Sequence, residues 1–272
     1  FITGSNSKLL SGELATHLSG RTISFRIMPF NFAEFCEFKM QGGTTKSREE
    51  LLEEFMKWGG FPLVCKETDE ISKEIVLSNI FDSVVLKDIM MRNKIVSPTA
   101  LEKVLEYVVA NSSTTISGNS IAAALSDENQ SVSAPTVYDY LKYISEACIC
   151  DKVLRYDIRG KKILAYEEKT YVCDLGFFQL KKNRVKDEYN YIVETICYNE
   201  LISRGYNVYI GKTYKGEVDF IAEKGKEKFY VQAAYLLSDE AVIEREFGAY
   251  DAINDNYPKY VISMDKIQMS RD

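Results

Sequence analysis

The first 35 residues constrain the fold most, because they have the pattern of one end of an α/β unit. Residues 1–2 are an apolar pair, residues 3–7 form a small polar turn, and residues 9–18 have the pattern of a helix. Residues 22–30 are rich in β-branched and aromatic side chains, which is typical of a strand. A parallel strand inside a sheet needs neighbours on both sides. We therefore expect an α/β remnant at residues 1–35, whose remaining strands lie in a missing N-terminal part of the protein.

The composition limits the classes of protein to which the chain can belong. Its 272 residues are enough for two or three domains, and 46% of them are hydrophobic, as in ordinary globular proteins. We find no run of about 18 apolar residues, so we expect no membrane contact and a cytoplasmic location. The net charge of −6 gives no overall basicity, although charge can be segregated between domains. One histidine, His17, and six scattered cysteines favour buried thiols over a zinc site.

Residues 36–97 have the pattern of a helical extension. Ser47 and Glu50 have the spacing of a capping box, and the sequence Gly59-Gly60-Phe61-Pro62 ends the helix that they begin. We expect a longer helix at residues 71–95, with Ile75 and Leu86 among its inward side chains.

Three helices and a hairpin are expected next. The helices are predicted at residues 99–110, 117–125 and 134–147, and two strands at 150–156 and 162–166 flank a turn with a glycine. Helix, helix, helix and hairpin is the order of a winged helix. We therefore predict a winged-helix domain at residues 98–186.

The last block has the pattern of a small α/β domain at residues 187–272. The predicted elements are a helix at 191–204, strands at 206–213, 217–222 and 228–234, a helix at 238–253 and a strand within 259–267.

Four short motifs occur in a particular order along the chain. They are Thr3-Gly4-Ser5-Asn6-Ser7, Phe30-x-Phe32-x-Glu34-Phe35, Gly59-Gly60-Phe61-Pro62 and Leu86-Lys87-Asp88-Ile89. Together they resemble prokaryotic ATPases of the AAA+ superfamily, and the last block is similar to the domain of unknown function that such ATPases carry. The resemblance implies a multidomain chain of α/β and α+β class. Its parts would be an ATPase remnant at 1–35, a lid-like extension at 36–97, a winged helix and a restriction-endonuclease-like α/β domain.

The resemblance also implies two nucleotide-sensing residues. Asn6 would sense the γ-phosphate, and Arg21 would reach the nucleotide of a neighbouring subunit. The alternatives are that Asn6 caps the next helix and that Arg21 makes a local ion pair. The sequence contains no Gly-x-x-x-x-Gly-Lys-Ser/Thr loop, so we expect no ATP hydrolysis by this chain alone. ATP and Mg²⁺ are expected only with the missing ATPase core.

The winged helix is a candidate DNA-binding element. Its third helix would enter the major groove, and its wing would contact the backbone. The candidate residues are Thr136, Tyr138, Lys142, Arg155, Arg159, Lys161 and Lys162, and a further basic cluster lies at 181–186. Such clustering in an acidic chain favours phosphate contact. Asp139 argues against it, since its carboxylate would repel phosphate, and winged helices also dock other proteins.

The last block carries part of a nuclease motif. Nucleases of the PD-(D/E)xK type place an Asp on one strand and Glu/Gln-x-Lys on the next, and the acids hold Mg²⁺. Asp219 and Gln232 match this pattern, Ala234 stands where the Lys is expected, and Glu200 is a candidate third ligand. The catalytic set is therefore degenerate, and an active enzyme would need another lysine, such as Lys212 or Lys215.

The sequence thus favours a C-terminal fragment of an AAA+ ATPase that contacts DNA without cleaving it. Two alternatives stay open. The first is a module that binds a partner protein and does not touch DNA, and the second is an active Mg²⁺-dependent nuclease. We expect no bound cofactor in this chain itself.

Overall fold

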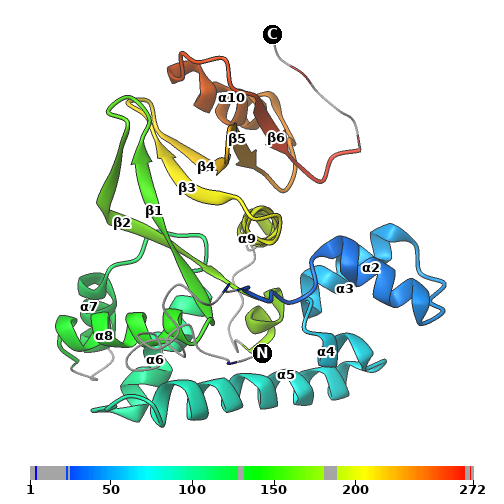
Figure 1. Cartoon of the computed structure of the whole chain (residues 1–272), viewed down its shortest axis with the longest axis vertical. Helices are drawn as coiled ribbons and strands as arrows, with labels where there is room; N and C mark the ends of the chain where they lie inside the picture. The colour runs from blue at the N-terminus through cyan, green and yellow to red at the C-terminus, as the bar shows by residue number, and fades with distance from the viewer. Residues whose placement is uncertain are drawn as a thin grey trace. The chain divides into compact units, whose positions relative to one another are not determined.

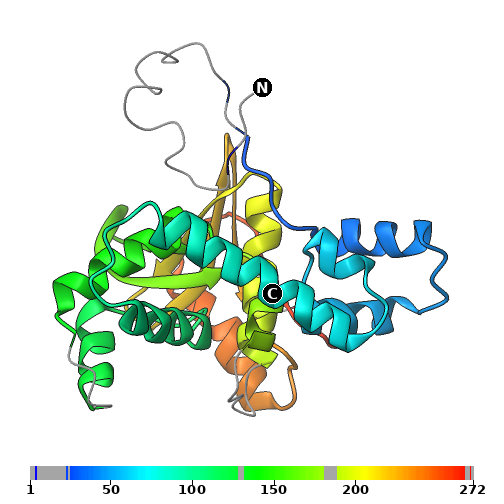
Figure 2. The ribbon, with the colours of Figure 1, turned by 90° about the horizontal axis from the view of Figure 1, so that it is seen from below.

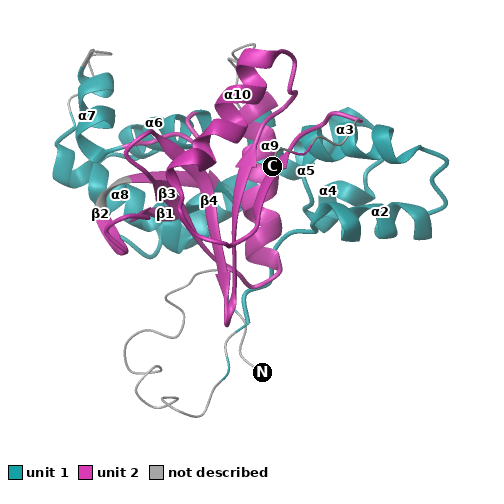
Figure 3. Cartoon of the chain, turned by 90° about the horizontal axis from the view of Figure 1, so that it is seen from above, with its two compact units in different colours: residues 1–110, 117–151, 172–182 teal, residues 111–116, 152–171, 183–272 magenta. Residues whose placement is uncertain are grey.

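The computed structural model describes residues 4, 23, 25–127, 132–180, 189–266 and 270. Two compact units are coloured separately in Figure 3. Unit 1 contains residues 1–110, 117–151 and 172–182, and unit 2 contains residues 111–116, 152–171 and 183–272. Within the described ranges, no helix is both long enough and apolar enough to cross a membrane.

Unit 1 is helical in the part that the structure describes, and Figure 2 shows it in a second view. Its elements are α2 (Phe32–Gln41), α3 (Arg48–Trp58), α4 (Pro62–Lys66), α5 (Glu70–Val84), the π-helix η2 (Val85–Met90), α6 (Pro98–Ala110), α7 (Gly118–Asp127), α8 (Ala134–Glu146) and the 3-10 helix η3 (Leu175–Leu180). The three helices expected in the winged helix are confirmed as α6, α7 and α8.

The start of α3 is fixed by the predicted capping box. The Ser47 side chain accepts a hydrogen bond from the Glu50 backbone, and the Glu50 carboxylate accepts one from the Ser47 backbone. At the other end Gly59 terminates the helix with φ 71° and ψ −159°, a region that is essentially restricted to glycine. Both helix boundaries were therefore readable from the sequence.

A buried carboxylate holds the Gly59-Gly60 turn in place. The Asp174 side chain accepts hydrogen bonds from the backbone N–H of Gly60 and from that of Gly176, each 2.8 Å long. Burial raises the pKa of Asp174 to about 7, although these backbone donors oppose the shift. The segment after the hairpin is thereby joined to the loop between α3 and α4, and Phe177 packs its ring on Phe61.

The long helix differs from the expectation in length and in its inward face. It ends as an α-helix at Val84 and continues as η2 to Met90. Ile75 and Leu86 are 56% and 54% exposed, so their expected inward orientation is wrong. Apolar residues occur on more than one side of this helix, and the periodicity therefore does not identify the buried face.

Unit 2 is built on a mixed sheet, labelled in Figure 1. Its elements are β1 (Cys150–Asp157), β2 (Lys162–Val172), α9 (Tyr189–Ser203), β3 (Asn207–Lys212), β4 (Glu217–Lys224), β5 (Glu227–Ala233), α10 (Glu240–Gly248), the 3-10 helix η4 (Ala249–Ala252) and β6 (Lys259–Ile262). The order of the described strands is β2-β1-β3-β4-β5-β6. The mixed α/β class that we expected is thus confirmed.

The predicted hairpin is part of this sheet. Strand β1 pairs in parallel with β3, with Arg155 opposite Ile210. Strand β4 is antiparallel to both of its neighbours, β3 and β5, and β6 is parallel to β5. The sequence did not indicate that the hairpin and the last block share one sheet, because periodicity identifies strands but not their non-local partners.

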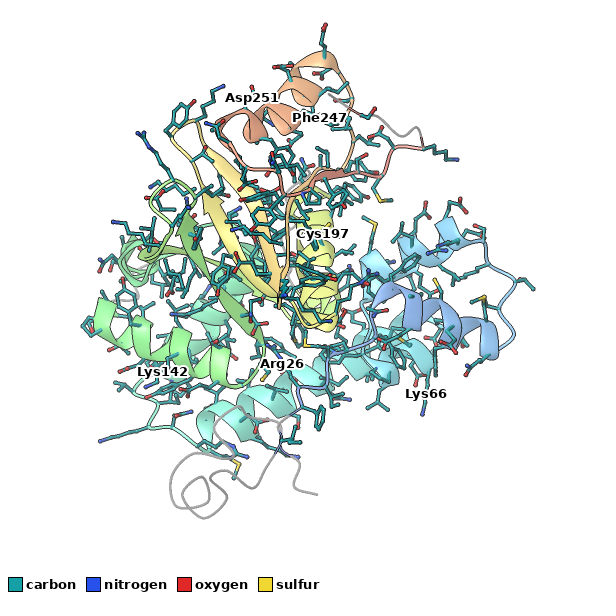
Figure 4. The ribbon with its side chains drawn as sticks, turned by 45° about the horizontal axis from the view of Figure 1, so that its top comes forward. Arg26, Lys66, Lys142, Cys197, Phe247 and Asp251 are labelled. Carbon is teal, nitrogen blue, oxygen red and sulfur yellow. The ribbon has the colours of Figure 1, made fainter. Side chains whose placement is uncertain are left out.

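Helices cover both faces of the sheet. On one face α9 contributes Val193, Cys197 and Leu201 to a buried cluster with strand residues such as Phe220. On the other face Tyr250 of η4 joins a second cluster. Figure 4 labels Cys197 on α9, and Phe247 and Asp251 where α10 passes into η4. The result is a three-layer α/β/α arrangement.

Candidate functional site

A pocket of about 530 Å³ lies in unit 2 and is lined by charged side chains. The lining residues come from α9, β4, β5, α10 and the loops beside them: Asn190, Glu194, Lys215, Gly216, Glu217, Asp219, Gln232, Ala233, Glu244, Arg245, Glu246, Gly248 and Ala249. The predicted nuclease residues Asp219 and Gln232 are both among them, so the structure brings these two together.

A β-bulge positions Asp219. Tyr209 of β3 lies opposite Ile221 of β4, whereas Gly211 lies opposite Val218, so β4 carries one extra residue between these pairs. Bulges re-aim side chains and are frequent beside functional sites. The Asp219 carboxylate also accepts a 2.8 Å hydrogen bond from the backbone N–H of Ala233. These contacts fix the carboxylate at the pocket wall.

The side chain of Gln232 is fully engaged by protein groups. Its Oε1 accepts a 2.6 Å hydrogen bond from the Asp219 backbone N–H, and its Nε2 donates a 3.0 Å bond to Glu246. Glu246 is itself buried and accepts from the Arg245 guanidinium. Gln232 thus acts as a structural link between β4 and α10.

The acid that α9 contributes to the pocket is Glu194. Glu200, the residue suggested by the sequence, lies on the same helix but forms an ion pair with Arg204 at 2.6 Å and does not line the pocket. A signal for Glu194 existed, since it shares the apolar face of the helix with Cys197 and Leu201. An acid on an apolar helical face is unusual and marks a buried interaction.

A buried lysine from the hairpin joins the acids. Lys169 Nζ lies 2.9 Å from Glu194 Oε1, and it also pairs with Glu217. The hydroxyl of Tyr171, two positions along the same strand, donates a 2.7 Å hydrogen bond to Glu194. Arg155 of β1 forms a second ion pair with Glu217 at 2.8 Å. The hairpin therefore supplies cations to two of the pocket's carboxylates.

The buried groups have strongly shifted pKa values. Burial, reinforced by the nearby charge of Glu194, raises the pKa of Asp219 to about 8. Burial likewise raises the pKa of Glu194, although Lys169 opposes this shift. For Lys169, burial alone would lower the pKa, but Glu194 and Glu217 outweigh it and raise the pKa above its usual value. At neutral pH the site therefore contains a charged lysine and a largely protonated Asp219.

This arrangement does not fit the Mg²⁺ site implied by the nuclease resemblance. Among the residues that the structure describes, no group of three or more His, Cys, Asp or Glu side chains is placed to hold a metal ion. The acids are instead bonded to Lys169, Arg155 and Tyr171, and both polar atoms of Gln232 are used. Position 234 contributes only a methyl group and a backbone bond to Ile262.

The two other lysines considered from the sequence lie in different places. Lys215 lines the pocket and pairs loosely with Asp251 at 3.5 Å. Lys212 lies on β3 and does not line the pocket. The lysine nearest to the acids is Lys169, which sequence reasoning missed because the second hairpin strand was expected to end at residue 166. The strand runs to Val172. Lys169 and Tyr171 are two positions apart on it, so their side chains point to the same face.

The candidate DNA-binding residues of α8 belong to unit 1. Thr136 is half-buried and bonds to Ser133, which caps the helix, whereas Tyr138 and Lys142 are exposed. Asp139 is also exposed on this helix. The helix can therefore present both a cation and an anion to a partner.

The candidate residues of the hairpin belong to unit 2. Arg159, Lys161 and Lys162 are exposed at or beside the turn between β1 and β2. Arg155 differs from them, because it is engaged by Glu217 and by Thr115. The nucleotide-sensing candidates Asn6 and Arg21, and the basic cluster at 181–186, lie outside the described residues.

Comparisons with known proteins identify the family. A family model described as "Domain of unknown function (DUF8612)" matches residues 49–186, which is more than half of the 272 residues. The chain belongs to the DUF8612 family. A second model, described as "AAA domain", matches residues 1–36, and residues 37–48 separate it from the DUF8612 match. The AAA relationship expected from the sequence is thus confirmed for this N-terminal segment.

Two curated relatives are similar along almost the whole chain. An uncharacterized protein of Haemophilus influenzae is 37% identical over 262 residues, covering 96% of this chain and 64% of the relative. The uncharacterized protein MJ1544 of Methanocaldococcus jannaschii is 36% identical over 269 residues, covering 94% of this chain and 59% of the relative. This DUF8612 chain therefore spans about three fifths of the length of these relatives. No solved structure matches it.

Proposed function

We propose that this chain is the C-terminal part of an AAA+ ATPase and contacts DNA through a winged helix and a nuclease-like domain that does not cleave it. The AAA domain match at residues 1–36 supports the first part of this proposal. The shares of 64% and 59% of the two relatives leave room for an ATPase core in a longer protein. That core would bring the ATP and Mg²⁺ sites, with Asn6 and Arg21 as sensing residues.

The observation that carries the non-cleaving function is the position of Lys169. Its ammonium lies between Glu194 and Glu217, where a nuclease would need carboxylates open to a metal ion. The ammonium supplies the positive charge that these acids require, and Ala234 provides none. A buried carboxylate paired in this way has little affinity left for a divalent cation.

The order of elements supports the nuclease-like fold. A helix, three antiparallel strands, a helix and a parallel strand follow one another as α9, β3, β4, β5, α10 and β6. Asp219 and Gln232 lie on adjacent strands at one pocket, as the metal-binding residues of such nucleases do. The fold is in this view retained, while the catalytic residues have been replaced by a network of internal bonds.

DNA contact is supported by exposed cations on both parts of the winged helix. Lys142 is exposed on α8, and Arg159, Lys161 and Lys162 are exposed at the hairpin turn. Phosphate binding requires a local concentration of positive charge. These cations provide one in a chain whose net charge is −6.

A partner protein is the second candidate ligand, and one observation favours it. Ile71 and Ile75, one turn apart on α5, are both more than half exposed, as is Leu86 on η2. Exposed apolar groups of this kind are typical of protein-docking surfaces. Such docking would regulate the ATPase without DNA contact.

Fluorescence anisotropy of labelled duplex DNA at increasing salt concentrations tests the proposal. We expect micromolar binding that weakens steeply as salt increases and that does not require Mg²⁺. Absence of binding at low salt would contradict DNA contact and leave the docking function as the better account.

A further inference from the structure

We infer that the mouth of the pocket in unit 2 binds single-stranded nucleic acid, with a base stacked on the Tyr189–Tyr235 pair and a phosphate at Arg245 and Lys215. The inference rests on the proposed nucleic-acid function and specifies its substrate class. It assigns a binding role to a pocket that the proposed function otherwise leaves without a ligand.

Two tyrosines stack on each other beside the pocket. The rings of Tyr189 and Tyr235 are stacked, with centroids 4.7 Å apart and planes 23° apart. Asn190 fixes the pair, because its side-chain oxygen accepts a 2.8 Å hydrogen bond from the Tyr235 backbone N–H. Asn190 also lines the pocket. Tyr235 packs against the core cluster of the sheet, and the more exposed Tyr189 stacks on it, next in the chain to the pocket-lining Asn190.

The ring of Tyr189 is accessible to a ligand. Tyr189 is 53% exposed, and its ring is held in place by the stack with Tyr235. An exposed, immobilised aromatic face is the element on which single-stranded nucleic acids stack their bases. A duplex keeps its bases stacked on one another, so its interior bases cannot use such a face.

The acids of the pocket are largely neutralised by other protein groups. Five carboxyl side chains line it, and five negative charges would repel a phosphate. Lys169 and Arg155 neutralise Glu194 and Glu217 from the hairpin side. Asp219 is largely protonated at neutral pH, because burial raises its pKa to about 8. Most of the repulsion is thereby removed.

Two cations, Arg245 and Lys215, line the pocket and are accessible to solvent. The Arg245 side chain is 68% exposed, and its Nε and Nη2 both donate to Glu246, which fixes the plane of the guanidinium. Lys215 is about half exposed, and its contact with Asp251 is long at 3.5 Å. An oriented guanidinium and a neighbouring ammonium are suitable partners for one phosphate.

The test compares the affinities of a labelled oligothymidine strand and a labelled duplex of equal length by anisotropy, using the chain and its variants. Tyr189→Ala should weaken binding of the single strand on the order of tenfold and leave duplex binding unchanged. Tyr189→Phe and Tyr189→Trp should keep the affinity, because both retain an aromatic face. Their binding also shows whether a loss in Tyr189→Ala is due to the ring.

Tyr260→Ala is the matched control. Tyr260 is 51% exposed and has an edge contact with Phe229. Unlike Tyr189, which precedes the pocket-lining Asn190, it has no chain neighbour that lines the pocket. Equal effects of Tyr189→Ala and Tyr260→Ala on the single strand would overturn the inference, and so would duplex binding without single-strand binding. In both cases the proposed DNA association would stand. If the chain binds neither nucleic acid, the proposed function fails together with the inference.

Discussion

The ammonium of Lys169 lies 2.9 Å from the carboxylate of Glu194, and both side chains are buried. Lys169 comes from the hairpin strand β2, and Glu194 comes from helix α9. The pair therefore joins the second strand of the hairpin to the helix that begins the last block of the chain. Its position among the pocket acids makes it both a structural contact and the reason to expect no metal chemistry.

Replacing Lys169 with Met should lower the free energy of unfolding by about 3 kcal/mol, because the buried Glu194 would lose the cation that neutralises its charge. Urea denaturation measures this change. The double variant Lys169→Met with Glu194→Gln should be less destabilised than the sum of the two single variants.

The exposed pair of Arg204 and Glu200 provides the control, since it also joins a cation to a carboxylate of α9. Arg204→Ala should change the free energy of unfolding by less than about 1 kcal/mol, as is usual for surface ion pairs. Equal effects of the two substitutions would show that the Lys169 pair is not buried in solution.

The stability of unit 2 should fall as the pH rises from about 4 to about 8. Asp219 has a folded-state pKa of about 8, above the usual value of about 3.9 that applies in the unfolded chain. Its contribution is therefore fully present below the unfolded-state value and is lost as the pH rises through the folded-state value. Asp219→Asn should flatten the pH dependence measured by urea denaturation at several pH values. An unchanged slope would contradict the raised pKa.

Alanine at Gly59 should be much more harmful than alanine at Gly43. Both glycines have positive φ, 71° and 78°, but a Cβ at Gly59 would lie 1.9 Å from Asp174 Oδ1, whereas a Cβ at Gly43 would meet nothing within 4 Å. We expect Gly43→Ala to cost about 1 kcal/mol in the free energy of unfolding and Gly59→Ala at least about 3 kcal/mol. Similar melting temperatures for the two variants would argue against the Asp174 contact.

The exposed cations of the hairpin turn should carry a large part of any DNA affinity. Replacing Arg159, Lys161 and Lys162 with Ala should weaken duplex binding at low salt and reduce the dependence of the binding constant on salt concentration. The control replaces Lys66, Lys94 and Lys226 with Ala. These lysines are also exposed, and their replacement removes the same net charge. Loss of affinity in both triple variants alike would indicate a general charge effect rather than a site.

Much of the local structure could be predicted from the sequence, because it depends on local signals. The Ser47 capping box, the stop at Gly59 and the order of elements in the last block all follow from residues close together in the chain. Lys169 and Glu194 could not be brought together in this way. Their contact depends on the parallel pairing of β1 with β3, which places the hairpin in the sheet that α9 covers. The nuclease motif did predict that Asp219 and Gln232 meet. That contact needs only the pairing of two strands that follow each other in the chain, β4 and β5.

The most direct test of the central claim is incubation of the chain with labelled single-stranded and duplex DNA in Mg²⁺ or Mn²⁺, with binding and product length measured on the same samples. The account predicts binding that persists in EDTA, with all DNA at full length, since Lys169 satisfies the acids that a metal would need. Cleavage that requires the divalent ion and disappears in Asp219→Ala would contradict it, and would make Lys169 the substitute for the lysine missing at position 234.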